Sequence, residues 1–168
     1  MKSLNSDNCV LCSSQKYPTI WATNLLRIVL INDQNYRGYC RVDLINHVKE
    51  MADLDEETRN EFMGVIFQTE KIIKEYLQPD KINLASLGNI TPHLHWHIIP
   101  RYFSDNHFPD SIWSKKKRNE INKFSKIQEF VNSKLDDLDF ETPCIGQNLI
   151  DKTYQNILIK ISENLNKK

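Results

Sequence analysis

The chain has 168 residues, of which 40% are hydrophobic and 26% are charged, so it can bury a sizeable core but is short for two domains. Lysine plus arginine and aspartate plus glutamate number 22 each, which excludes a global field that would draw the protein to nucleic acid or acidic membranes. We therefore expect a small-molecule partner and neither a nucleic-acid nor a membrane partner.

The N-terminal segment is polar over residues 1–8 and lacks the apolar core of a secretory signal, and no stretch has the apolar length that spans a bilayer. We therefore expect a cytoplasmic protein. In a reducing compartment, Cys9 and Cys12 are not expected to form a stable disulfide, and their C-x-x-C spacing is typical of half a zinc site or of a redox pair. A redox pair needs a thioredoxin-like βαβ context that is missing here, so the pattern favours zinc.

Two strands are expected next. Residues 25–31 are almost continuously apolar and rich in branched side chains, which predicts a central strand buried on both faces. Residues 33–38 contain turn-forming residues, and residues 39–45 give a second strand. The two strands are expected to form a hairpin at the centre of an antiparallel sheet.

A long helix follows over residues 55–77, where apolar side chains recur at helical spacing. Asp55 is the expected N-cap, and Pro79 stands beyond the expected end. The apolar stripe of this amphipathic helix is expected to pack in the core.

The remaining elements alternate with loops. Residues 81–87 return as a strand, residues 88–92 form a loop, and residues 93–101 form a further strand. Residues 121–135 and 149–165 each show a periodicity compatible with a helix. We interpret the last two as a helical C-terminal addition.

Three of the five histidines, His93, His95 and His97, occupy alternate positions in the strand predicted over residues 93–101. Because successive side chains of a strand point to opposite faces, this spacing places three imidazoles on one face. Imidazole can act near neutral pH as a nucleophile, a general acid or base, or a metal ligand. The row therefore predicts a functional site, and the residues by themselves leave nucleophile and ligand both open.

Together with Gly88 and Asn89 upstream, this run resembles the signature of the histidine triad (HIT) family of nucleotidyl hydrolases and transferases, including its bacterial members similar to diadenosine tetraphosphate hydrolase. The resemblance implies an α+β fold, in which one long helix packs on an antiparallel sheet of about five strands. We expect residues 1–113 to form the HIT-like catalytic domain and residues 114–168 to form a helical extension packed on the same domain. The resemblance also implies a homodimer.

The activity implied is hydrolysis at the α-phosphate of a (di)nucleoside polyphosphate or a nucleoside phosphoramidate, through a covalent nucleotidyl-histidine intermediate. By residue-by-residue match, His95 is the nucleophile, and its other ring nitrogen donates to the backbone carbonyl of His93. His97 is expected to contact the phosphate or donate a proton toward the leaving group. Asn89 is expected to hydrogen-bond a phosphate oxygen. This chemistry requires no cofactor.

The upstream matches concern substrate and metal. Asn32 and Asp33 stand where the family has its ribose-binding acid, although Asp33 can equally be a turn-capping aspartate. Many members have a histidine where this chain has Tyr39, and the difference is expected to remove a helper from the site. Members with an N-terminal C-x-x-C bind structural zinc through a set that corresponds here to Cys9, Cys12, His47 and His93.

Two other functions stay open at this level. One is a nucleotide-binding or metal-binding regulatory protein that keeps the fold without turnover. The other is a metal-dependent hydrolase that uses all three triad histidines as ligands. The intact triad favours a hydrolase with a histidine nucleophile.

Overall fold

The computed structural model describes residues 9–13, 17–31, 33, 35–118, 159, 163, 165 and 166. Its elements are α1 (Val10–Ser13), β1 (Thr19–Ala22), β2 (Leu26–Leu30), β3 (Cys40–Leu44), the 3₁₀ turn η2 (Met51–Asp53), α2 (Glu56–Leu77), β4 (Lys81–Ala85) and β5 (His95–Arg101). The helices predicted over 121–135 and 149–165 lie almost entirely outside the described residues. The domain division after residue 113 therefore stays a prediction.

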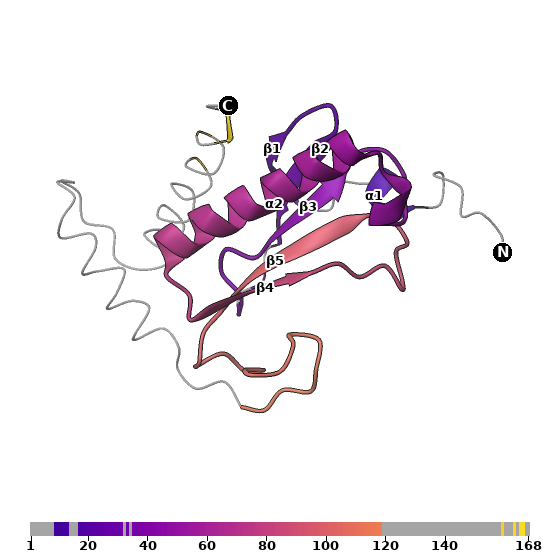
Figure 1. Cartoon of the computed structure of the whole chain (residues 1–168). Helices are drawn as coiled ribbons and strands as arrows, with labels where there is room; N and C mark the ends of the chain where they lie inside the picture. Colours follow the sequence, from indigo (N-terminus) through magenta and orange to yellow (C-terminus); the bar gives the residue numbers. More distant parts are fainter. Residues whose placement is uncertain are drawn as a thin grey trace.

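The five strands form one antiparallel sheet in the order β1-β2-β3-β5-β4. The long helix α2 runs across one face of this sheet (Figure 1). The α+β fold with about five strands and one packed helix is therefore confirmed. None of the described helices is long and apolar enough to cross a membrane.

The predicted hairpin is present, since β2 and β3 pair from Leu26 opposite Leu44 to Leu30 opposite Cys40. Its turn contains Gly38 at φ +78°, a conformation that glycine adopts without strain. A Cβ at this position would lie 2.2 Å from Leu77 Cδ1, so a larger residue here would have to displace the end of that side chain. Every residue of β2 is buried, as expected of a strand covered on both faces.

The helix begins as predicted. The Asp55 carboxylate accepts a hydrogen bond from the backbone N–H of Thr58 at 2.8 Å, which satisfies one of the free donors of the first turn. At the other end, Gln78 adopts the left-handed conformation at φ 45° and its N–H donates to the Lys74 carbonyl. The cap and the C-terminal turn therefore set the limits of α2.

The side chains of each strand alternate between two different environments. The face toward α2 is apolar, and its fully buried residues include Ile28, Val42 and Ile98, packed with Phe62 and Ile66 of the helix. By the period of two, the opposite face carries the polar side chains of Arg27, Arg41, Asp43, His95 and His97. This second face is the one on which the chemistry-bearing residues gather.

The C-terminal residues that the structure describes reach the same core. Leu165 is buried in the apolar cluster under the sheet, and the indole N–H of Trp21 donates to the Asn166 side chain at 2.9 Å. This contact joins the end of the chain to β1, the edge strand that sequence analysis did not predict.

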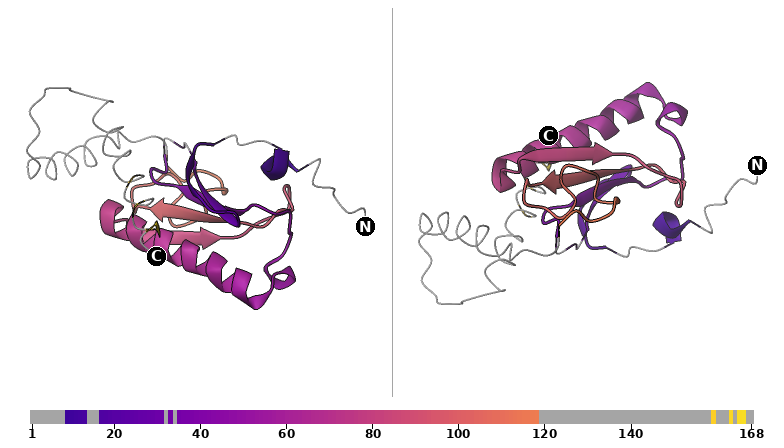
Figure 2. Two further views of the ribbon diagram at one scale, coloured as in Figure 1. Left: turned by 90° about the horizontal axis from the view of Figure 1, so that it is seen from above. Right: turned by 90° about the horizontal axis from the view of Figure 1, so that it is seen from below.

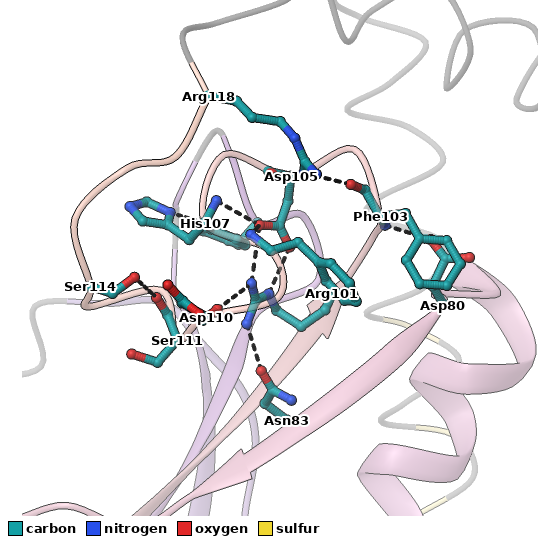
Figure 3. A network of polar contacts seen from close by, with 12 residues as sticks. Asp80, Asn83, Arg101, Phe103, Asp105, His107, Asp110, Ser111, Ser114 and Arg118 are labelled. Carbon is teal, nitrogen blue, oxygen red and sulfur yellow. Dashed lines mark hydrogen bonds and ion pairs between the residues drawn. The ribbon is translucent and has the colours of Figure 1, made fainter.

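The segment 102–118 follows β5 and lies on the side of the sheet away from α2 (Figures 1 and 2). Arg101, at the end of β5, holds it: the guanidinium donates two hydrogen bonds to Asp105, at 2.7 and 3.0 Å, and one to the Asp110 carbonyl at 2.8 Å (Figure 3). A further hydrogen bond reaches Asn83 on β4 at 2.6 Å. The segment therefore has a fixed place over the histidine-bearing face.

Candidate functional site

His95 and His97 lie side by side on β5, with their rings edge to face and their centroids 4.9 Å apart. β5 begins at His95, two residues later than predicted. The ring of His93 is turned toward Cys9, Cys12 and His47 instead. The three imidazoles therefore divide into a pair and a single ring.

The protonation of His95 follows from one hydrogen bond. Its Nδ1 lies 2.5 Å from the backbone carbonyl of His93, and a carbonyl can only accept, so Nδ1 carries the proton. Burial lowers the pKa of His95, which favours the neutral ring. A neutral ring protonated on Nδ1 has its free lone pair on Nε2, and this is the form in which imidazole is a nucleophile.

Arg41 and Asp43 lie on β3 opposite His97 and His95, and Arg27 lies on β2 opposite Asp43. Asp43 is fully buried and pairs directly with His95 across the sheet. It accepts from Arg27 Nε at 3.1 Å and from Arg41 Nε and Nη2 at 2.5 and 2.9 Å. Arg41 is the cation that acts on both His95 and His97, whereas Arg27 also donates to the Leu11 carbonyl at 2.5 Å. The guanidinium of Arg41 beside the histidines suits an anionic phosphate.

These three residues were not among the site residues predicted from the sequence, although their charges stand out within strands predicted to be buried. Arg27 interrupts an otherwise apolar run, and Arg41 and Asp43 alternate with apolar residues in the second predicted strand. Charged residues in strands predicted to be buried need a partner. That requirement could have placed them together.

His97 has two aromatic neighbours. Its Nδ1 lies 2.6 Å from the Tyr39 hydroxyl, and its ring meets Trp113 edge to face at a centroid distance of 5.3 Å. Burial lowers the pKa of His97 to about 4, with smaller contributions from His95 and Arg41. Tyr39, which stands where many family members have a histidine, therefore contacts the triad directly, and the loss of a helper at this position stays a prediction.

The expected substrate-binding residues lie in loops. Asn89 is exposed in the loop between β4 and β5, and among the described residues no hydrogen bond joins its side chain to a histidine. Asp33 caps the turn after β2, where its Oδ1 accepts from the Asn35 backbone N–H at 2.8 Å. Asn32 lies outside the described residues.

A cluster of Cys9, Cys12, His47 and His93 lies at the N-terminal end of β5, and its four potential ligand atoms are all within 4.8 Å of one another. The Sγ atoms of both cysteines lie 3.4 Å from His93 Nδ1, and Cys12 Sγ also lies 3.4 Å from His47 Nδ1. Two thiols and two imidazoles match the donor set of tetrahedral metal sites. The cluster can therefore hold a metal ion.

The orientation of His93 fits such a site. Its Nε2 donates to the Leu44 carbonyl at 2.7 Å, which leaves the Nδ1 lone pair facing the cysteines. Burial lowers the pKa of His93 and keeps the ring in the neutral form that binds metals. The backbone carbonyl of His93 also accepts the hydrogen bond from His95 Nδ1, so His93 links the cluster to His95 and its neighbour His97.

The chain is similar to known proteins in sequence and in fold. Residues 15–104, more than half of the chain, match the HIT domain family model. A histidine triad protein from Bradyrhizobium japonicum is 29% identical over 70% of this chain and 87% of its own, with a TM-score of 0.56. A histidine triad protein from Marinobacter aquaeolei VT8 is 25% identical over 73% of this chain and 88% of its own, with a TM-score of 0.55.

More distant structures share the fold alone. A HIT family member from Bacillus subtilis is 17% identical over 80% of this chain and 99% of its own, with a TM-score of 0.54. No curated protein matches the sequence significantly.

Proposed function

Since this chain belongs to the histidine triad family, we propose that it is a nucleotidyl hydrolase acting at the α-phosphate of a (di)nucleoside polyphosphate or a nucleoside phosphoramidate. The bond cleaved is a phosphoanhydride or a phosphoramidate bond. The observation that carries this proposal is the hydrogen bond from His95 Nδ1 to the His93 carbonyl. It leaves a buried, neutral imidazole with its lone pair on Nε2, near the Arg41 guanidinium.

The reaction has two displacements. Nε2 of His95 attacks the α-phosphorus in line, the bond to the leaving oxygen or nitrogen breaks, and the N–H of the neutral His97 ring donates a hydrogen bond to that atom. A phosphate leaving group departs as an anion, and an amine takes a proton from water. Water then attacks the phosphorus of the nucleotidyl-His95 intermediate, the bond from phosphorus to Nε2 breaks, and the proton of the attacking water goes to solvent. The mononucleotide leaves, and His95 returns to its starting form. Covalent catalysis of this kind replaces one difficult displacement by two easier ones.

The surrounding residues have binding roles in this proposal. Arg41, held by Asp43, supplies positive charge that stabilises charge on the phosphate oxygens. Asn89 donates to a phosphate oxygen from its loop. Asp33, together with Asn32, binds the ribose hydroxyls, with one carboxylate oxygen already used to cap the turn.

We further propose that the Cys/His cluster binds zinc. Two thiolates and two imidazoles close a tetrahedral shell, so no position remains for a substrate or a reactive water. Zinc is therefore structural, and the chemistry proceeds without it. In the same proposal the enzyme is a cytoplasmic homodimer without a nucleic-acid partner, and diadenosine tetraphosphate is one candidate substrate.

The geometry argues against a metal enzyme built on the triad. A shared metal would need the three rings to converge, but His93 faces the cysteines while Nδ1 of His95 is bound to a carbonyl. Among the described residues, the potential metal cluster contains neither His95 nor His97.

The test is a rapid-quench experiment with diadenosine tetraphosphate labelled at the α-phosphate. The wild type should form an acid-labile, base-stable adduct that maps to His95. His95→Asn keeps a donor near the His93 carbonyl but has no nucleophile, so it should form no adduct and lose at least about 1,000-fold in turnover.

His107→Gln is the matched control, because His107 is a buried histidine whose Nδ1 contacts the Tyr36 hydroxyl rather than the triad. It should keep the adduct. The hydrolase proposal fails if the wild type and His95→Asn turn over a panel of nucleotides equally slowly. Nucleotide binding without turnover would then identify a binding protein. Loss of turnover within seconds of adding a chelator would instead identify a metal-dependent hydrolase.

A further inference from the structure

Tyr39 and His97 form a buried pair that the proposed reaction does not yet use. The tyrosine precedes β3, and its hydroxyl lies 2.6 Å from His97 Nδ1. Its side chain is only 5% exposed, and the two ring planes meet at 51°. The position follows Gly38, whose φ of +78° directs the chain into β3.

The protons of this pair can be counted. Burial raises the pKa of Tyr39, so its hydroxyl stays protonated near neutral pH. Burial lowers the pKa of His97 to about 4, so its ring is neutral and carries one proton. The pair therefore holds two protons, and only one of them can lie between the hydroxyl oxygen and Nδ1.

Two arrangements are then possible. Either the hydroxyl donates to Nδ1 and the ring proton is on Nε2, or Nδ1–H donates to the hydroxyl oxygen and the phenolic proton needs another acceptor. His97 is the hydrogen-bond partner of this hydroxyl among the residues that the structure describes. A buried proton without an acceptor is costly, so the first arrangement is favoured.

We propose that Tyr39 is a positioning residue that fixes the tautomer of His97, with the proton held on Nε2. This inference rests on the proposed function, in which an N–H of His97 donates a hydrogen bond to the leaving atom. A ring protonated on Nδ1 would have no N–H to donate from Nε2. Tyr39 acts through His97, without touching the substrate, by keeping the donor N–H on Nε2.

The proposal predicts a dependence on the leaving group. Tyr39→Phe removes the hydroxyl but keeps the ring. With an alkylamine phosphoramidate, whose amine is a poor leaving group, we expect kcat to fall about tenfold with little change in KM. With the p-nitrophenyl ester of adenosine monophosphate, whose leaving group departs as a stable anion, we expect kcat to stay within about twofold, and the same holds for diadenosine tetraphosphate, which releases a nucleoside polyphosphate anion.

Tyr36→Phe is a matched control. Tyr36 is 4% exposed, lies in the turn preceding β3, and also places its hydroxyl on a histidine Nδ1, that of His107. Removal of this hydroxyl should leave kcat unchanged for both substrates. Thermal unfolding of both variants shows whether a fall in kcat comes from lost stability or from the lost hydrogen bond to His97.

A spectroscopic readout is independent of turnover. Long-range ¹H–¹⁵N spectra of the ¹⁵N-histidine-labelled protein distinguish a ring protonated on Nε2 from one protonated on Nδ1. We expect the wild type and Tyr36→Phe to show His97 protonated on Nε2, and Tyr39→Phe to show a mixture of both forms. An Nδ1-protonated His97 in the wild type would overturn the proposal, as would equal losses on both substrates.

The hydrolase activity and the positioning role of Tyr39 can be overturned separately. If no His95 adduct forms even with the p-nitrophenyl ester, the nucleotidyl hydrolase proposal fails. The tautomer of His97 is then still decided by the spectra. If the adduct forms normally but Tyr39→Phe and Tyr36→Phe behave alike in both assays, the hydrolase proposal holds and Tyr39 has no positioning role.

Discussion

The two ends of β5 are held by different chemistry. At the N-terminal end, His93 lies in a cluster of thiols and imidazoles that bond one another weakly but bind metal ions strongly. At the C-terminal end, the buried Arg101 is paired with Asp105 and bonded to Asn83, so this anchor is complete within the chain. His95 and His97 therefore lie between a cluster that can hold a metal ion and an ion pair that is complete without one.

The largest expected effect is at the metal end. Protein purified without added metal should carry about one zinc per chain, and Cys9→Ser should lose it. Zinc binding is worth roughly 10–16 kcal/mol in small zinc-dependent peptides, so we expect a stability loss of more than about 5 kcal/mol in this larger domain. Metal analysis and chemical unfolding measure the two quantities.

A cysteine outside the cluster provides the control for that experiment. Cys40 is fully buried in the apolar core, so Cys40→Ala should lower stability while the zinc content stays the same. A native wild type that carries no metal and unfolds at the same temperature as Cys9→Ser would show that both ends of β5 are held by the chain itself.

The second effect is at the ion-pair end. Arg101→Met leaves the Asp105 carboxylate buried without its cation, which costs roughly 3–5 kcal/mol. The substitution also removes the hydrogen bonds that hold the segment 102–118, whose Trp113 ring packs against His97. Turnover should therefore fall while the zinc content is unchanged. Urea unfolding and metal analysis test whether the two anchors are independent.

The matching control is an exposed ion pair in the same segment. Lys117 and Asp110 lie 2.8 Å apart and are about half exposed, so Lys117→Met should cost less than about 1 kcal/mol. Loss of zinc from Arg101→Met would mean that the two ends form one cooperative unit.

The regular elements were predictable because their signal is local. The hairpin of β2 and β3 and the helix α2 follow from apolar periodicity within single segments. β1 was missed because it has four residues, lies at the sheet edge and is only partly buried. A strand of this kind has neither the length nor the alternation that a pattern needs.

The site was predictable only in part, for a related reason. Alternation predicted one face for all three imidazoles, but the Leu94 N–H donates to the carbonyl of the distant Val48, and β5 begins only at His95. Tyr39 and Trp113 reach His97 from segments 58 residues before it and 16 after it. The first contact depends on the pairing of β3 with β5 and the second on how 102–118 folds back over the sheet, and no local pattern encodes either.

The smallest expected effect is the response of the Arg101 anchor to acid. Burial opposes ionisation of Asp105, but hydrogen bonds from Arg101 and from two backbone amides outweigh it and lower the pKa of this carboxyl. Its pKa in the unfolded chain is about 3.9. A carboxyl with a lower pKa in the folded state contributes stability that is complete above the unfolded value and is lost as the pH falls through the folded value.

The stability difference between the wild type and Asp105→Asn should therefore be constant from about pH 7 to 5 and shrink as the pH approaches 3, because groups common to both proteins cancel. A difference that already shrinks between about pH 7 and 5 would place the ionisation of Asp105 above its usual range, and this end of β5 would then be held by neutral hydrogen bonds rather than by an ion pair.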